Sequence, residues 1–182
     1  MITTCTPIAR TITDGQISKA VYFMTHGFDP TKDTIDKKKR LAGAITEVHI
    51  AEWIKVPHSG KFKFDFNIKG KRIEVKTANQ NGNYSPPYSY ESGVSNRSTI
   101  NCDYFLFCRL LWNHKLPEHM KKLWIMGMIS QTDFDDKAEF FNEGDIVSSN
   151  GHKCTCDCHI IKYKHLSPAH ELLGVEVCDE CE

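Results

Sequence analysis

Two acidic residues and one lysine have the spacing of a metal-dependent hydrolytic site. Asp65 lies in a stretch of alternating apolar and polar residues, and Glu74 and Lys76 lie in a second such stretch directly after it. Mg²⁺ typically takes one or two carboxylates and completes its shell with water and substrate phosphate. A neighbouring lysine can position water or stabilise charge on the phosphate. On spacing alone the residues fit either phosphate-ester cleavage or, more commonly for such a pattern, a solvated strand face with weak ion pairs.

A β-hairpin is the element that would bring these side chains together. Residues 61–77 show two runs with the period of 2 that is typical of strands with one buried face. Gly70 and Lys71 fit the central positions of a two-residue turn between the runs. With this turn, Asp65 lies opposite Lys76, and the charged side chains share the face away from the core.

Asp65 followed by Glu74-Val75-Lys76 resembles the signature of the PD-(D/E)XK nuclease superfamily. The resemblance implies a catalytic Mg²⁺ or Mn²⁺ held by Asp65, Glu74 and the Val75 carbonyl, with Lys76 beside the hydrolytic water. A helix before the hairpin often supplies another acidic residue in this family, and Glu47 is similarly placed. The resemblance also implies an α/β fold of the restriction-endonuclease-like type, which is a mixed central sheet flanked by helices.

The resemblance extends over about residues 40–130 in matching order, and it includes Asp103 as the acidic residue that opens the next strand. Glu52 is an alternative to Glu47 as the acidic residue from the helix, because it projects between apolar residues of the same helix and would need a partner if buried. The chain departs from the family pattern after the hairpin. Residues 79–99 read as a long loop instead of a helix, and Gln80 at its start is close enough in sequence to reach the site.

The remaining elements follow from periodicity and from turn residues. Apolar runs predict buried central strands over residues 104–111 and 123–130. Helices are predicted over residues 16–26, 41–54 and 132–142, and a short one after Pro168. The histidines of the second helix and of the segment after it, His49 and His58, are expected to lie on the surface.

Length and composition predict a single domain. The 182 residues suffice for one core, and we divide them into an N-terminal helical segment (1–40), a nuclease core (41–130) and a cysteine-rich C-terminal element (150–182). Residues 1–122 carry 19 Lys and Arg against 11 Asp and Glu, whereas residues 123–182 carry 4 against 12. The basic part is the expected DNA-binding side. We expect a cytoplasmic protein without a membrane partner, since neither a long apolar run nor a secretion signal occurs.

Five of the eight cysteines are concentrated near the C-terminus, in the pattern of a structural zinc site. Cys154, Cys156 and Cys158 would point to one side of a strand. Two of them are expected to bind zinc together with Cys178 and Cys181, and the metal would hold the C-terminal β tail against the preceding hairpin. His152 or His159 can substitute for one ligand, and free surface thiols are the alternative. The candidates are Cys154, Cys156, Cys158, Cys178 and Cys181.

These observations predict a DNA nuclease, more specifically an endonuclease, that uses a metal-activated water. The second hypothesis is a non-catalytic DNA- or protein-binding protein of the same fold with a structural zinc site. A zinc-binding interaction module with an accidental hairpin motif ranks third. The sequence leaves open which DNA is cut, and whether the protein forms a homodimer.

Overall fold

The computed structural model describes residues 7–26, 37–58, 64–80, 82, 86, 90–95, 100–113, 115–116, 118–147 and 151–174. The elements in chain order are β1 (Ile8–Thr11), α1 (Asp14–His26), α2 (Lys37–Ile54), β2 (Phe66–Ile68), β3 (Lys71–Asn79), β4 (Glu91–Ser95), β5 (Tyr104–Leu111), η3 (Glu118–Met120), β6 (Lys122–Ser130), α3 (Gln131–Lys137), β7 (Glu139–Phe141), β8 (Ile146–Val147), β9 (His152–Lys153), β10 (Cys158–Lys162), η4 (Tyr163–His165) and α4 (Ala169–Leu173).

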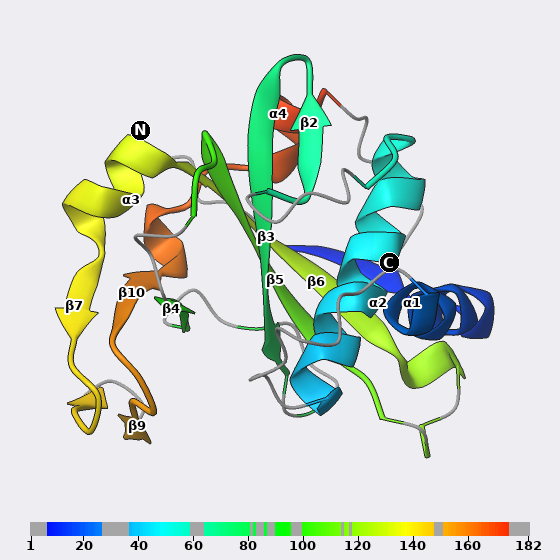
Figure 1. Ribbon diagram of the computed structural model, residues 1–182, viewed down its shortest axis with the longest axis horizontal. Helices are drawn as coiled ribbons and strands as arrows, with labels where there is room; N and C mark the ends of the chain where they lie inside the picture. The colour runs from blue at the N-terminus through cyan, green and yellow to red at the C-terminus, as the bar shows by residue number, and fades with distance from the viewer. Residues whose placement is uncertain are drawn as a thin grey trace.

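A mixed five-stranded sheet organises this α/β fold, with strand order β1-β6-β5-β3-β2 (Figure 1). Only β3 and β5 pair in parallel, and the other neighbours in this sheet are antiparallel. One face packs against α1, α2 and α4. The other face packs against α3 and a small second sheet with the order β4-β10-β7. Among the described residues, no helix has the length and apolar character that a membrane crossing requires.

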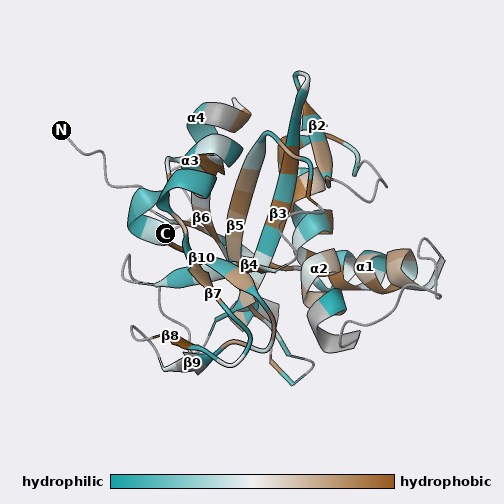
Figure 2. Cartoon of the chain, turned by 60° about the vertical axis from the view of Figure 1, so that its left-hand side comes forward, coloured by the Kyte–Doolittle hydropathy of each residue, from teal (hydrophilic) through white to brown (hydrophobic). Residues whose placement is uncertain are grey.

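Strand β5 is the centre of both cores, as its apolar sequence predicts. Leu106 and Cys108 are fully buried on the side of the long helices, and Phe105 and Phe107 are fully buried on the side of the second sheet. Figure 2 shows hydrophobic colouring along this strand and hydrophilic colouring over much of α3. Because its two faces are covered, β5 supplies a rigid neighbour for β3, the strand that carries Glu74 and Lys76.

The hairpin turn lies one residue earlier than predicted, at Lys69 and Gly70. Both residues have positive φ, 50° and 81°, as a type I′ turn requires. The Asn67 side chain accepts a hydrogen bond from the Gly70 N–H at 3.1 Å, which stabilises the turn and allows a non-glycine residue at its first central position. The predicted Gly70-Lys71 turn is therefore wrong.

A local irregularity at the start of β2 also changes the predicted partner of Asp65. Phe66 lies opposite Ile73, yet the Asp65 N–H donates to the carbonyl of the same Ile73 at 2.9 Å. Two successive residues thus face one, as in a β-bulge, which redirects a side chain. Asp65 does not lie opposite Lys76. Its Oδ2 instead accepts a hydrogen bond from the Val75 N–H at 2.7 Å.

Other elements differ from prediction where tertiary pairing decides. The predicted helix over residues 132–142 ends at Lys137, because residues 139–141 form β7 and pair with β10. Its N-cap is Ser130, whose hydroxyl accepts from the Asp133 N–H. Residues 91–95 of the predicted loop form β4, which pairs with the other edge of β10.

Candidate metal centre

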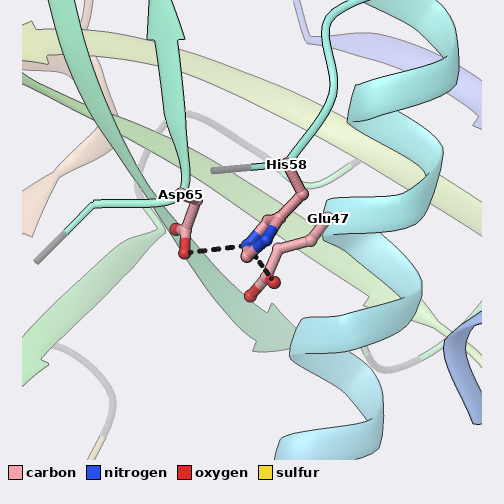
Figure 3. A group of neighbouring side chains, drawn as sticks. All are labelled: Glu47, His58 and Asp65. Atoms are coloured by element: carbon pink, nitrogen blue, oxygen red, sulfur yellow. Dashed lines mark ion pairs between the residues drawn. The ribbon is translucent and has the colours of Figure 1, made fainter. Parts of the chain in front are cut away.

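Three side chains from separate parts of the chain converge at one end of the hairpin. Glu47 projects from α2, His58 from the segment that follows α2, and Asp65 from the residue before β2 (Figure 3). Each offers one ligand atom, and these atoms lie within 4.8 Å of one another. All three residues are partly buried, so the group is shielded by protein yet accessible to solvent. We refer to Glu47, His58 and Asp65 as the metal triad, because their ligand atoms are close enough to hold one metal ion.

His58 is the member that sequence reasoning missed, and its predicted surface position is wrong. Its Nε2 lies 2.9 Å from Glu47 Oε2 and 3.5 Å from Asp65 Oδ1. The ring makes edge contacts with Phe23 and Phe66, at centroid distances of 5.2 and 5.6 Å. These aromatic contacts fix the imidazole plane and direct Nε2 toward the two carboxylates.

The charges of the metal triad are balanced by opposing effects. Burial alone would lower the pKa of His58, but the adjacent carboxylates of Asp65 and Glu47 raise it to about 9. Burial raises the pKa of Asp65, and the negative charge of Glu47 raises it further. In the metal-free protein a protonated His58 thus supplies positive charge between two carboxylates.

Glu74 and Lys76 form an ion pair beside the triad. Lys76 Nζ lies 2.6 Å from Glu74 Oε1, and both side chains are largely buried. Burial raises the pKa of Glu74, and the charge of Asp65 adds to the effect, so Asp65 and Glu74 are within electrostatic reach. Glu74 was predicted as a metal ligand, but it does not belong to the triad, whose ligand atoms all lie within 4.8 Å of one another.

Glu47 and Glu52 have different surroundings although both lie on α2. Glu47 belongs to the triad, whereas Glu52 accepts hydrogen bonds from Gln16 and Lys19 of α1. The structure therefore brings Glu47, and not Glu52, to Asp65. Gly43 lies one turn before Glu47, and a Cβ there would lie 3.7 Å from Glu47 Oε1, which is an ordinary van der Waals distance, so the position of the carboxylate does not depend on glycine at residue 43.

Several other predicted residues have structural contacts. Asp103 accepts hydrogen bonds from the Arg72 guanidinium at 2.9 Å and from the Arg72 N–H at 2.8 Å. It therefore links β3 to the start of β5 and is not a member of the metal triad. Gln80 is buried and accepts from Arg109 at 3.1 Å. His49 is also buried, contrary to its predicted surface position, with its Nδ1 3.1 Å from Gln16 Oε1.

The donor set of the triad fits a divalent cation. Two carboxylates and one imidazole suit Mn²⁺ or another first-row metal better than Mg²⁺, which strongly prefers oxygen ligands. The raised pKa of Asp65 also favours cation binding. Burial and the nearby charge of Glu47 make the ionised carboxylate unfavourable, and a bound cation would offset that negative charge.

Cys154 and Cys158 form a second candidate metal site. Both are buried, and their Sγ atoms lie 3.5 Å apart. Two thiolates on one tetrahedral Zn²⁺, with bonds of about 2.3 Å, would be roughly 3.8 Å apart, which is close to this spacing. Burial, together with the adjacent Cys154, raises the pKa of Cys158 to about 12, and a bound cation would favour the deprotonated thiolate.

The other proposed zinc ligands do not join this pair among the described residues. The Cys156 Sγ donates to the Ser95 hydroxyl at 3.2 Å, and His159 packs its ring against Phe140. The expectation that Cys154, Cys156 and Cys158 share one side of a strand is wrong, because a bend precedes β10. Cys178 and Cys181, and the side chain of His152, lie outside the described residues.

A zinc assay tests the cysteine prediction directly. We expect one zinc per chain in protein purified without chelator, by native mass spectrometry, and loss of that zinc in the variant Cys154→Ser/Cys158→Ser. The matched control is Cys108→Ser, because Cys108 is buried in β5 of the central sheet and does not belong to the Cys154–Cys158 pair. Wild-type protein without zinc would contradict the prediction.

The chain matches no protein-family model, no curated protein and no solved structure.

Proposed function

We propose that this protein is a divalent-metal-dependent nuclease that hydrolyses phosphodiester bonds in DNA. The observation that carries the proposal is the convergence of Glu47, His58 and Asp65 beside the Glu74–Lys76 ion pair. Acidic ligands can hold a cation that activates water, and an adjacent lysine can stabilise the charge that develops on a phosphate, so the combination suits phosphodiester hydrolysis.

The order and pairing of the surrounding elements support a restriction-endonuclease-like fold as part of this proposal. A helix that carries Glu47 comes first, the β2–β3 hairpin follows, and β5 then pairs in parallel with β3. This is the order in which the PD-(D/E)XK resemblance expects its residues. The second sheet and the cysteine pair are additions to that core.

Each side chain has a distinct role in the proposal. Glu47, His58 and Asp65 would hold Mn²⁺ or Mg²⁺, with Glu74 as a further acidic residue at the edge of the site. The cation, when bound, would supply a more acidic water and neutralise charge on the phosphate oxygens. Lys76, which Glu74 orients at 2.6 Å, would position the attacking water and stabilise the negative charge that grows on the phosphate.

Two glutamates of α2 provide a matched test. Glu47→Gln should lower DNA cleavage about 10²-fold to 10³-fold, because it removes a charged ligand and leaves the shape unchanged. Glu52→Gln, five residues along the same helix, should lower cleavage far less, since Glu52 contacts Lys19 and Gln16 and is not a member of the triad. Cleavage of supercoiled and linear DNA with Mg²⁺ or Mn²⁺ measures both, and we expect Mn²⁺ to give the faster rate.

Equal effects of the two substitutions would contradict the proposal, and so would wild-type protein that cuts no DNA with either metal. A protein that binds DNA but does not cut it would instead favour the non-catalytic alternative.

A further inference from the structure

A cavity of about 520 Å³ lies between α1 and α2 and shares its wall with the metal triad. Glu47 and His58 belong to both. The other described lining residues come from one face of each helix: Ser18, Lys19, Tyr22, Phe23, Ala44, Val48, Ala51 and Glu52. A ligand bound at the triad would therefore be in contact with this space.

The wall of the cavity is mainly apolar and aromatic, although the ionisable side chains of Lys19, Glu47, Glu52 and His58 also line it. Phe23 packs against the His58 ring, and Tyr22 is 65% exposed on α1. Val48 and Ala51 supply the aliphatic wall opposite. A site with these properties favours a flat, weakly polar group. It disfavours a phosphate, because its cationic side chains, Lys19 and His58, are already paired with the carboxylates of Glu52 and Glu47.

We infer that this cavity receives one unstacked nucleobase of the strand whose phosphate lies at the metal triad, so that the preferred substrate is single-stranded or frayed DNA. The inference rests on the proposed nuclease function and names its substrate class. Every base has a π-face that can stack on an aromatic ring, so such a site tolerates different bases.

The two residues that the cavity shares with the triad are the reason to infer a nucleobase as its ligand. A base is attached to the phosphate by only a sugar, so a pocket whose wall includes two triad residues lies within reach of the nucleotide next to the cut. The volume falls within the range of about 300–1,000 Å³ typical of small-molecule pockets, which leaves room for a base with its sugar.

Intact duplex DNA cannot use this cavity without distortion. Its bases are stacked and paired, and moving one of them out of the helix breaks its base pair and its stacking contacts. Single strands and frayed ends do not have to be unpaired first. The inferred order of preference is therefore single strand or frayed end first, and continuous duplex last.

The test is a scan with single-stranded oligonucleotides that each lack one base at a successive position. Binding is measured by fluorescence anisotropy with Ca²⁺, and cleavage with Mn²⁺. We expect one position, next to the cut, at which loss of the base weakens binding about tenfold, because the stacking contact between that base and an aromatic side chain is lost.

Tyr22→Ala and Val21→Ala form the matched pair of variants. Tyr22 lines the cavity, whereas its neighbour Val21 is exposed on α1 and does not line it. Tyr22→Ala should bind the complete oligonucleotide about tenfold more weakly and lose the response to the missing base. Val21→Ala should behave as the wild type.

The two proposals fail in different ways. Cleavage that depends on Asp65 but ignores the missing base at every position would overturn the base pocket and leave the nuclease standing. A response to the missing base without cleavage would overturn the nuclease alone. Discrimination that persists in Tyr22→Ala, or stronger binding to duplex than to single strand, would also overturn the pocket.

Discussion

Replacing Asp65 by asparagine should lower DNA cleavage about 10³-fold and raise the thermal stability of the metal-free protein. Asp65 is the triad member in contact with both His58 and the Val75 N–H. Asparagine keeps an oxygen for the Val75 hydrogen bond but removes the charge that a cation needs. A loss of several kcal/mol of transition-state stabilisation corresponds to roughly this factor.

The rise in stability follows from the sign of the pKa shift. Burial and the charge of Glu47 raise the pKa of Asp65 in the folded state above its unfolded value. Ionised Asp65 therefore destabilises the folded protein at neutral pH, and this cost disappears as the pH falls below the unfolded pKa. The substitution Asp65→Asn would remove this cost at pH 7, and substitutions of this kind at functional sites typically raise the unfolding temperature by a few degrees.

Asp103→Asn is the matched control because it should have the opposite effects. Arg72 lowers the pKa of Asp103 to about 2, so the ionised form stabilises the folded state above the unfolded pKa near 3.8. The side chain is about one-third exposed, so we expect a loss of less than about 1 kcal/mol at pH 7, with cleavage retained. If Asp65→Asn lost both stability and activity, Asp65 would be a structural residue.

Sequence patterns predicted the parts of the fold that depend on long-range burial. The apolar run of β5 required covering on both faces, and the structure covers it with helices on one side and the second sheet on the other. The hairpin was also predictable, since alternation over residues 71–77 continues into strand β3. What periodicity could not supply was the register, which depends on one turn and one bulge.

The register was missed because local contacts outweighed the preference for glycine. Gly70 was expected at the first central position of the turn, but the structure places Lys69 there with positive φ. The Asn67 side chain offsets part of that cost by accepting from the Gly70 N–H. The bulge at Asp65 has no sequence signature of its own, yet it determines which atoms the carboxylate contacts.

His58 could not be found from periodicity because it lies in neither a helix nor a strand. Its place depends on the length of chain between the end of α2 and the hairpin, and on packing against Phe23 and Phe66. The only signal was chemical: a histidine 11 residues after Glu47 and seven before Asp65. A search for ligand types near the predicted site would have included it.

The cysteine pattern was misjudged for a similar reason. Alternation along a strand would place three cysteines on one side, but the chain bends at residues 155 and 156. Two contacts fix this bend: the Asp157 side chain accepts from the Glu143 N–H at 2.8 Å, and the Cys154 N–H donates to the Asp145 carbonyl at 2.8 Å. As a consequence the Sγ atoms of Cys154 and Cys158 lie 3.5 Å apart, and the Sγ of Cys156 contacts the Ser95 hydroxyl instead.

Replacing Lys76 by methionine should lower cleavage about 10²-fold or more and also destabilise the protein. Glu74 is largely buried, and its ammonium partner at 2.6 Å compensates for its charge. Removal of one partner leaves a buried charge unpaired, which typically costs about 3–5 kcal/mol for a fully buried pair and less for this partly accessible one. A loss of activity alone would therefore not separate catalysis from folding.

The double variant Glu74→Gln/Lys76→Met separates the two effects. Removing both charges with side chains of similar size should restore most of the stability, because no uncompensated charge remains. Cleavage should stay at least about 10²-fold below the wild type, since no ammonium group remains to position water or stabilise the phosphate charge. Lys71→Met, an exposed lysine at the other end of the same strand, is the control and should change neither property. Recovery of cleavage together with stability in the double variant would show that Lys76 acts only as a structural partner of Glu74, and the proposed hydrolytic mechanism would then lose its lysine.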